Sequence, residues 1–196
     1  MTSVLEPTRK WEALLEAIQE AQVVSPEEYE SLPESRLLEL VDGVVRVMTP
    51  ATRRHQEIVD ALKSACRRLC PPNYVVVREQ ELRIKNDHRR VPDIMIIKAE
   101  ADNDDRYWFS PADTLLVVEV VSPHTETVDR LHKPAEYAAA GIEHYWRVEP
   151  RPSVAIHTHQ LGPQGSYAFT GKFVEGDVVA AAGLPWAKVS VADLVG

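Results

Sequence analysis

The sequence predicts an α/β protein in which a mixed β-sheet is flanked by helices, and three observations support this. Apolar runs at residues 91–97 and 115–121 have the length and composition of buried strands. Residues 52–70 and 124–140 are predicted to be helices, and the first of these is clearly amphipathic. Helices and groups of strands therefore alternate along the chain, which is typical of helices packed on a sheet. The apolar face of the first helix consists of His55, Ile58, Val59, Leu62, Ala65, Cys66 and Leu69.

Composition limits the classes of protein that this chain can belong to. Its 196 residues are enough for one domain with a substantial core. A net charge of −8 argues against a surface that coats nucleic acid, although it allows a local basic site. The first residues are polar and partly acidic, so no signal peptide is expected, and no apolar run reaches the roughly 20 residues of a membrane span. We expect a cytoplasmic protein that does not bind membranes.

The N-terminal part contains two local signals. A helical lead-in is predicted over residues 1–24, before a single domain over residues 25–196. Residues 25–28 (SPEE) form a helix-start signal, because proline is favoured at the first helical position. In segment 36–50, Asp42-Gly43 lies between two β-prone runs and predicts a hairpin.

The elements after the amphipathic helix are predicted mainly as strands. Residues 74–84 are expected to form one strand, and the polar residues 85–90 a turn. Residues 99–113 are expected to be an acidic, irregular loop. Gly141 is expected to end the helix that precedes it, as a C′ glycine. A strand is predicted at 144–150, followed by short strands with glycine turns.

Two acidic residues stand in otherwise apolar strands. Glu119 interrupts LLVVEVV, and Asp93 comes near the start of VPDIMII. A lone buried carboxylate costs several kcal/mol unless it is compensated. If the two strands are neighbours, the carboxylates converge and, with water and a main-chain carbonyl, suit Mg²⁺ or Mn²⁺. Each acid could instead simply pair with a nearby arginine.

These acids belong to a longer pattern of residues. It comprises residues 39–43 (ELVDG), His55, Pro92-Asp93, residues 119–123 (EVVSP), Asp129, Lys133, Tyr137 and residues 141–146 (GIEHYW). In this pattern and in the closing LPWAKVSVADL, the chain resembles the bacterial family of putative restriction endonucleases catalogued as domain of unknown function 820 (Uma2-type). This family lies within the PD-(D/E)XK nuclease superfamily. The resemblance covers roughly residues 25–196 and implies a restriction-endonuclease-like fold and a Mg²⁺- or Mn²⁺-dependent endonuclease acting on DNA.

The resemblance also implies which residues form the site. Asp93, Glu119 and Glu39, with the main-chain carbonyl of Val120, would hold the metal, whose bound water attacks phosphorus. The same acids, together with a lysine, would be the catalytic residues. Glu39 could instead be an exposed residue on an edge hairpin.

The chain departs from the superfamily pattern at the catalytic lysine. The pattern expects lysine two positions after Glu119, but Val121 stands there. Lys133, on the following helix, is the best candidate to orient the water and stabilise the transition state. The alternative is that Lys133 only pairs with Asp129 one helical turn away.

Other residues are expected around this centre. The predicted substrate contacts are His55, Arg54 and Arg90, and the predicted supporting residues are Asp129, Tyr137 and Ser122. His55 could instead be a satisfied core or capping histidine, and the arginines could be ordinary solvated side chains. Zinc at Cys66 and Cys70 is disfavoured because no second ligand pair accompanies them.

Two other classes of function remain open from the sequence. The chain could be a catalytically inactive binding or regulatory domain on a nuclease-derived fold, or a structural α/β domain whose acids only form salt bridges. A homodimer is expected for the nuclease, because cutting both strands of a duplex usually needs two sites.

Overall fold

The computed structural model describes residues 12, 15, 23–33, 37–103, 105–123 and 126–195. Most of the predicted helical lead-in at 1–24 lies outside these residues, so the lead-in and its boundary with a single domain stay predictions. In the described part, none of the helices has both the length and the apolar character needed to cross a membrane.

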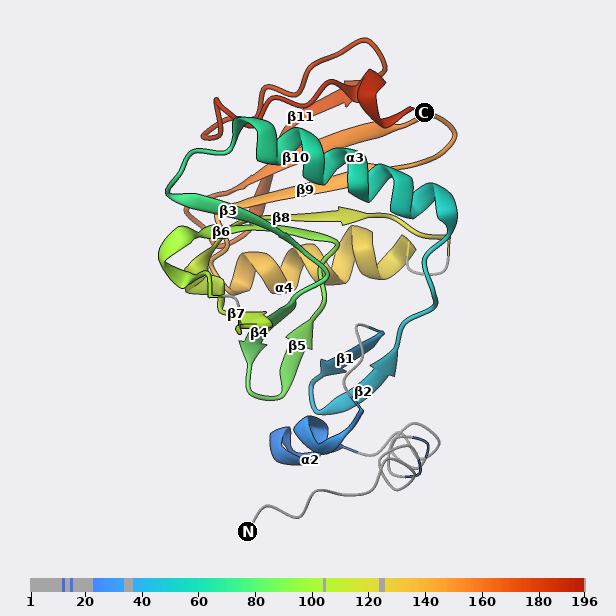
Figure 1. The fold of residues 1–196 in the computed structure, drawn as a ribbon, viewed down its shortest axis with the longest axis vertical. Coiled ribbons are helices and arrows are strands. Elements are labelled where there is room, and N and C mark those ends of the chain that lie inside the picture. The colour runs from blue at the N-terminus through green and yellow to red at the C-terminus, as the bar shows by residue number, and fades with distance from the viewer. Residues whose placement is uncertain are drawn as a thin grey trace.

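Among the described residues, the larger of two sheets has six strands in the order β11-β10-β9-β8-β6-β3 (Figure 1). These strands are β3 (Tyr74–Arg78), β6 (Ile94–Lys98), β8 (Thr114–Val120), β9 (His144–Glu149), β10 (Ala155–Leu161) and β11 (Tyr167–Val174). β8 and β9 run parallel, whereas the other neighbours are antiparallel, so the sheet is mixed. The strands predicted at 91–97, 115–121 and 144–150 are confirmed within two or three residues at their ends.

Helices cover both faces of this sheet (Figure 1). α3 (Arg53–Leu69) packs Ile58 and Leu62 against one face, together with Val118 and Val120 of β8. α4 (Lys133–Ala139) packs Tyr137 on the other face, against Val117 of β8. Both faces are therefore buried, which explains why β6 and β8 are apolar almost throughout. The predicted amphipathic helix is confirmed except at Leu69, which is 43% exposed in the last turn.

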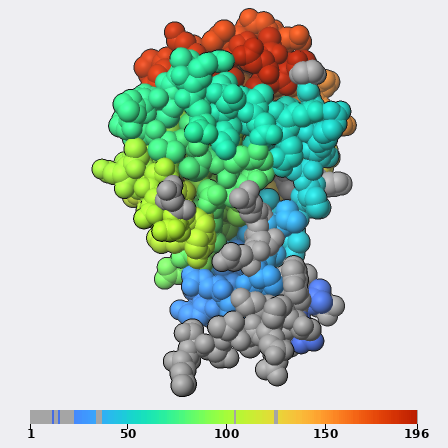
Figure 2. Space-filling view, viewed as in Figure 1, coloured from blue at the N-terminus to red at the C-terminus, as the bar shows by residue number. Residues whose placement is uncertain are grey.

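The chain after β11 folds back onto the first of these faces. Its apolar residues Val179, Leu184 and Val189 share one core cluster with α3. The short 3₁₀ helix η4 (Val191–Leu194) contributes Val191 and Leu194 to the same cluster. This C-terminal segment (red) thus lies beside α3 at one end of the molecule (Figure 2).

The second sheet has five strands in the order β2-β1-β5-β4-β7. They are β1 (Leu38–Val41), β2 (Val44–Val47), β4 (Glu81–Lys85), β5 (His88–Arg90) and β7 (Trp108–Phe109). The predicted hairpin is confirmed, because Asp42 and Gly43 join β1 and β2 with φ values of 51° and 78°. α2 (Pro26–Ser31) is capped by Ser25, whose hydroxyl accepts a hydrogen bond from the amide of Glu28, as the helix-start signal predicts.

Two predictions about segment 74–90 are wrong. The single strand predicted at 74–84 is two strands in different sheets, because the chain turns at Glu79, whose φ is 49°. The predicted polar turn at 85–90 contains strand β5, whose residues are all buried. Burial of this basic strand is possible because glutamates from distant segments neutralise it. The predicted mixed sheet flanked by helices is confirmed in the six-stranded sheet, and the five-stranded sheet is an addition to it.

Two further segments differ in detail from the sequence prediction. The loop at 99–113 contains the short 3₁₀ helices η1 (Ala99–Ala101) and η2 (Pro111–Asp113) as well as β7. The helix predicted at 124–140 contains a π-helical segment, η3 (Val128–His132), immediately before α4. Pro134 has no N–H to donate, which favours this widening of the helix. Gly141 has a φ of 82°, as expected of a C′ residue.

Candidate active site

Asp93 and Glu119 lie at the same end of two neighbouring strands. β6 and β8 are antiparallel, with Ile94 opposite Val118, so the residue before β6 meets Glu119 of β8. The Oδ2 atom of Asp93 accepts a hydrogen bond from the main-chain amide of Val120 at 2.7 Å. The expectation that the two acidic strands are neighbours is therefore confirmed.

Glu119 points to the face of the sheet that α4 covers. Its Oε1 atom lies 3.0 Å from the Nζ atom of Lys133 and accepts a hydrogen bond of 2.6 Å from the hydroxyl of Tyr137. Lys133 and Tyr137 are four residues apart, so they lie on the same side of α4. The side chains of Glu119 and Lys133 are only 3% and 6% exposed, so this contact offsets part of the cost of burying each group.

Lys133 contacts two further acids. The Oδ1 atom of Asp129, one helical turn earlier, is 3.4 Å from Nζ, and the Oε1 atom of Glu39 is 3.8 Å from it. The pairing of Lys133 with Asp129 is thus present, but it is one of three ion pairs of this lysine. Lys133 thus contacts acids from three elements: Glu39 of β1, Glu119 of β8 and Asp129 of η3.

Glu39 reaches this cluster from the five-stranded sheet. It lies on β1, which has β2 on one side and β5 on the other, and it is 4% exposed. Its Oε2 atom accepts a hydrogen bond from Arg90 at 2.7 Å, and its Oε1 atom accepts one from the amide of Val91 at 3.1 Å. The alternative of an exposed residue on an edge hairpin is therefore wrong for Glu39.

Arg90 is buried between two glutamates. In addition to Glu39, it binds Glu136 of α4 with two hydrogen bonds of 2.8 and 2.7 Å, and Glu136 lies 3.1 Å from Nε2 of His88. A guanidinium held in this way faces protein carboxylates on both sides. The structure thus gives Arg90 a place inside the cluster, and the predicted phosphate contact of this residue has no support from its position.

His55 approaches the same strand ends from the opposite face. Its Nε2 atom is 3.1 Å from the carbonyl oxygen of Val120 and 3.3 Å from Oδ2 of Asp93. Its own amide donates to the hydroxyl of Thr52, which caps α3, so the first turn of the helix fixes its position. His55 therefore contacts both Asp93 and the carbonyl of Val120, two of the predicted metal ligands.

A small pocket of about 100 Å³ opens beside His55. Arg54 and Ser122, both predicted site residues, line it together with Arg130 and Glu149. Its lining includes His55 and Val121, so the pocket lies beside the C-terminal end of β8. Arg54, unlike Arg90, lines this pocket.

Burial and charge set the protonation of the cluster. Burial raises the pKa of the Glu119 carboxyl to about 8, although the charge of Lys133 acts in the opposite direction. Burial also lowers the pKa of Lys133, but the surrounding acids, Glu119 above all, outweigh this and leave it well above its ordinary value. For His55, burial lowers the pKa, but the hydrogen bond and charge of Asp93 raise it above its ordinary value.

Within the described ranges, no three histidine, cysteine, aspartate or glutamate side chains form a group that could hold a metal ion. Asp93, Glu119 and the Val120 carbonyl lie at the ends of β6 and β8. Glu39 already accepts hydrogen bonds from Arg90 and from the amide of Val91. Cys66 is buried, and burial raises the pKa of its thiol to about 12, which suits a packing residue.

Sequence reasoning missed His88 and Glu136 as members of the buried network. Glu136 lies three residues after Lys133 on the same helix, so its spacing was a usable signal. His88 lies in a short polar segment without periodicity, and nothing in the local sequence indicates that it is buried.

Comparisons with known proteins agree with this fold. A family model described as "Uma2: Putative restriction endonuclease" matches residues 26–192. The structure resembles a crystal structure of a putative nuclease belonging to DUF820 from Anabaena variabilis ATCC 29413, with a TM-score of 0.70 and 18% sequence identity. That match covers 87% of this chain and 97% of the other. A search of curated proteins found no match. Since the family model spans most of its residues, the chain belongs to the Uma2 family of putative restriction endonucleases.

Proposed function

We propose that this protein is an endonuclease that uses Mg²⁺ or Mn²⁺ to hydrolyse phosphodiester bonds of DNA. The observation that carries the proposal is the contact of 3.0 Å between Lys133 and Glu119, beside Asp93 at the strand ends. It supplies a cation next to the paired acids, although Val121 occupies the position where the superfamily pattern has lysine. Membership of a family described as restriction endonucleases supports the same reaction.

The residues at the strand ends suit a hard divalent cation. Carboxylate and carbonyl oxygens are the ligands that Mg²⁺ prefers, and Mg²⁺ usually takes one or two carboxylates and keeps several waters. The protein contacts described above use Oε1 of Glu119 and Oδ2 of Asp93. Glu119 and Asp93, with the carbonyl of Val120, would hold the ion. A bound ion would lower the pKa of a water and stabilise the charge that develops on phosphate.

The net charge of the cluster also favours a cation. The acids Glu39, Glu119 and Asp129 surround the ammonium of Lys133, and Asp93 raises the pKa of Glu119 further. Arg90 pairs with Glu39, so four acids face two cations. A divalent ion beside Glu119 would stabilise its ionised form and reduce this excess of negative charge.

The residues of this chain have distinct tasks in the proposed reaction. Lys133 positions the attacking water and stabilises the negative charge of the transition state. Tyr137 fixes the orientation of Glu119 through its hydroxyl, and His55 holds Asp93 and the Val120 carbonyl together. Arg54, at the adjacent pocket, contacts a phosphate of the substrate.

The direct test is cleavage of plasmid and single-stranded DNA by the purified protein with Mg²⁺ or Mn²⁺. We expect cutting that EDTA stops and that Glu119→Gln reduces by at least about 10³-fold, because glutamine is a poor metal ligand. Glu143→Gln is the matched control, since Glu143 is 56% exposed and follows α4 at the other end of the sheet from Glu119. Cutting that survives Glu119→Gln would refute the proposed mechanism.

The burial of Glu119 also supports a second candidate function, a binding domain without turnover. Glu119 is 2% exposed and already paired with Lys133 and Tyr137, as in a purely structural cluster. In that case DNA would be bound but not cut, and Mg²⁺ would not raise the melting temperature. Metal-dependent stabilisation that disappears in Glu119→Gln distinguishes the nuclease from this candidate.

A further inference from the structure

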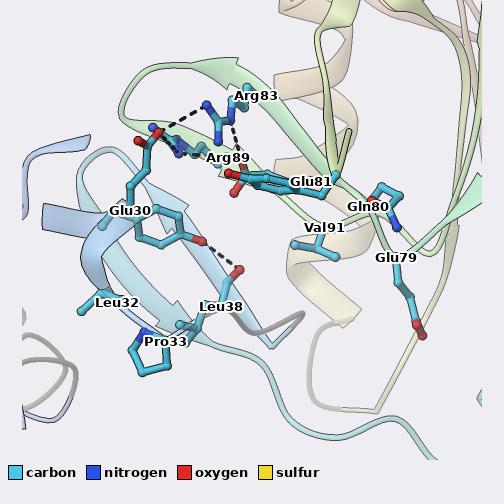
Figure 3. Close-up of a pocket in the computed structure, with 12 residues that line it drawn as sticks. Glu30, Leu32, Pro33, Leu38, Glu79, Gln80, Glu81, Arg83, Arg89 and Val91 are labelled. Atoms are coloured by element: carbon cyan, nitrogen blue, oxygen red, sulfur yellow. Dashed lines mark hydrogen bonds and ion pairs between the residues drawn. The ribbon is translucent and has the colours of Figure 1, made fainter. Parts of the chain in front are cut away.

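A larger pocket of about 380 Å³ lies between α2 and the five-stranded sheet (Figure 3). Part of its lining is apolar or aromatic: Leu32, Pro33, Leu38, Val91, Tyr29 and Tyr107. The hydroxyl of Tyr29 donates a hydrogen bond to the carbonyl of Leu38 at 3.1 Å, which fixes that ring in the wall. The volume lies within the range of small-ligand sites, which are typically apolar with a few convergent polar groups.

The polar lining includes a group of two arginines and two glutamates that contact one another. Arg83 and Arg89 lie 3.3 and 3.1 Å from the same Oε1 atom of Glu30, and both also contact Glu81. Figure 3 shows these contacts on a different side of the pocket from Leu32 and Pro33, with Glu79 pointing away from them. The side chain of Arg89 is only 4% exposed, so this is a fixed polar wall with donors and acceptors.

Aromatic rings extend this wall. The guanidinium of Arg89 lies 5.3 Å from the ring centre of Tyr29, and that of Arg83 lies 5.9 Å from the ring centre of Tyr107. Such cation–π contacts hold the arginines and the rings together in the pocket wall. Tyr107 is 56% exposed, so much of its surface is available to a ligand.

The charge of the pocket disfavours a phosphate. Arg83 and Arg89 are balanced by Glu30 and Glu81, and Glu79 adds a further acid to the lining. An anion would therefore meet carboxylates that already occupy the guanidinium groups. An uncharged planar group with donors and acceptors at its edge meets no such penalty.

The pocket and the proposed active site share the same strands. Side chains alternate along a strand, so Leu38 and Arg89 face the pocket, whereas Glu39 and Arg90 face Lys133 and Glu136. The lining residue Val91 donates its amide to Glu39. At the other end of the lining, the amide of Glu79 donates to the carbonyl of Asp93 at 3.2 Å.

From this geometry we infer that the pocket binds a nucleobase of the strand that is cut, next to the phosphodiester that is hydrolysed at Asp93 and Glu119. The inference rests on the proposed function and narrows its substrate. A base has flat faces for the tyrosines, an edge for the arginine–glutamate wall, and no charge. Because a paired and stacked base cannot enter a pocket, the substrate is single-stranded, frayed or flipped out at this position.

Binding measured in EDTA tests the pocket without requiring cleavage. The probe is a fluorescent single-stranded oligonucleotide, compared with the same oligonucleotide carrying abasic sites, and the readout is anisotropy. We expect Tyr107→Ala to weaken binding of the intact strand by about 5- to 30-fold, as loss of one stacked base would. The variant should no longer distinguish intact from abasic strands, and Tyr107→Trp should restore the distinction.

Phe169→Ala is the matched control, because Phe169 is an exposed aromatic residue (59%) on β11, in the other sheet. If Tyr107→Ala binds both strands as Phe169→Ala does, the pocket inference is wrong, even if the protein cuts DNA. If the base preference is present and depends on Tyr107 but no cleavage occurs with Mg²⁺ or Mn²⁺, the pocket stands and the nuclease proposal fails. The pocket inference and the nuclease proposal can therefore be refuted independently.

Discussion

The Nζ atom of Lys133 lies 3.0 Å from the Oε1 atom of Glu119, although a helix supplies the first residue and a buried strand the second. This contact explains how one carboxylate can stand inside an apolar strand. It also places an ammonium group beside Asp93 without a lysine at position 121. Asp129 and Glu39 share the same lysine, so its removal affects more than one acid.

We predict that Lys133→Met lowers the free energy of unfolding by about 3 kcal/mol at neutral pH, because it leaves the buried acids Asp129 and Glu39 without this cation. The pKa of Glu119 is already raised to about 8 in the folded protein with Lys133 present, so Glu119 is largely protonated at neutral pH. The loss should therefore grow as the pH rises through about 8, where Glu119 ionises beside Lys133 in the unchanged protein but not in the variant. Urea unfolding at several pH values measures it.

The control for this prediction is Lys98→Met. Lys98 is an exposed residue at the end of β6, so its loss should change the stability by less than about 0.5 kcal/mol. A Lys133→Met protein as stable as this control at neutral pH would contradict a compensating role for Lys133.

Arg54 and Arg53 form a matched pair for testing the phosphate contact. Arg54 lines the pocket beside His55, whereas the side chain of Arg53 is 87% exposed and pairs with Glu57. We predict that Arg54→Gln raises KM for DNA several-fold, leaves kcat nearly unchanged and reduces the salt dependence of binding by about one ion. Arg53→Gln should change none of these values. Equal effects of both substitutions would argue for a diffuse charge effect.

Glu136 should make the stability depend on pH. Burial raises the pKa of Glu136, but hydrogen bonds from His88 and Arg90 outweigh it and lower the value from 4.5 to about 2. The hydrogen bond to Glu136 raises the pKa of His88 above 6.5. The contribution of Glu136 is therefore complete above about pH 4.5 and lost toward pH 2, whereas that of His88 is complete below 6.5 and lost above its raised value.

We accordingly predict that Glu136→Gln lowers the free energy of unfolding by about 3 kcal/mol between pH 4.5 and pH 6.5. The loss should become smaller as the pH falls toward 2. Thermal or urea unfolding across this range is the measurement. Glu126→Gln is the comparison, because Glu126 is half exposed and pairs with Arg130 at the surface. A constant cost of Glu136→Gln at every pH would show that ionisation does not matter.

Two leucines of α3 differ in how far their burial agrees with the sequence prediction. Both were expected on the apolar face, but Leu62 is fully buried and Leu69 is 43% exposed. We predict that Leu62→Ala lowers the free energy of unfolding by about 3 kcal/mol, since it removes buried methyl groups and leaves a cavity. Leu69→Ala should cost less than about 1 kcal/mol. Similar losses in urea unfolding would mean that the helix end packs more tightly than described.

Much of the fold could be predicted because its signals are local. The amphipathic period of α3, the Asp42-Gly43 turn and the apolar runs of β6 and β8 each lie within one short segment. The break at Glu79 could not be predicted, because Val77 and Leu82 read as one β-prone segment although they join different sheets. Periodicity shows which face of a strand is apolar, but not which sheet contains the strand.

The sequence by itself determined the pair of acidic strands, their apolar surroundings and, through the family resemblance, Lys133 as the candidate cation. Only the tertiary structure decided which charges meet. Glu39 binds Arg90 and approaches Lys133 because β1, β5 and α4 come together. Arg89 pairs with Glu30 in the wall of the pocket of about 380 Å³. The physical reason is that a buried charge requires a partner, and that partner comes from segments far apart along the chain.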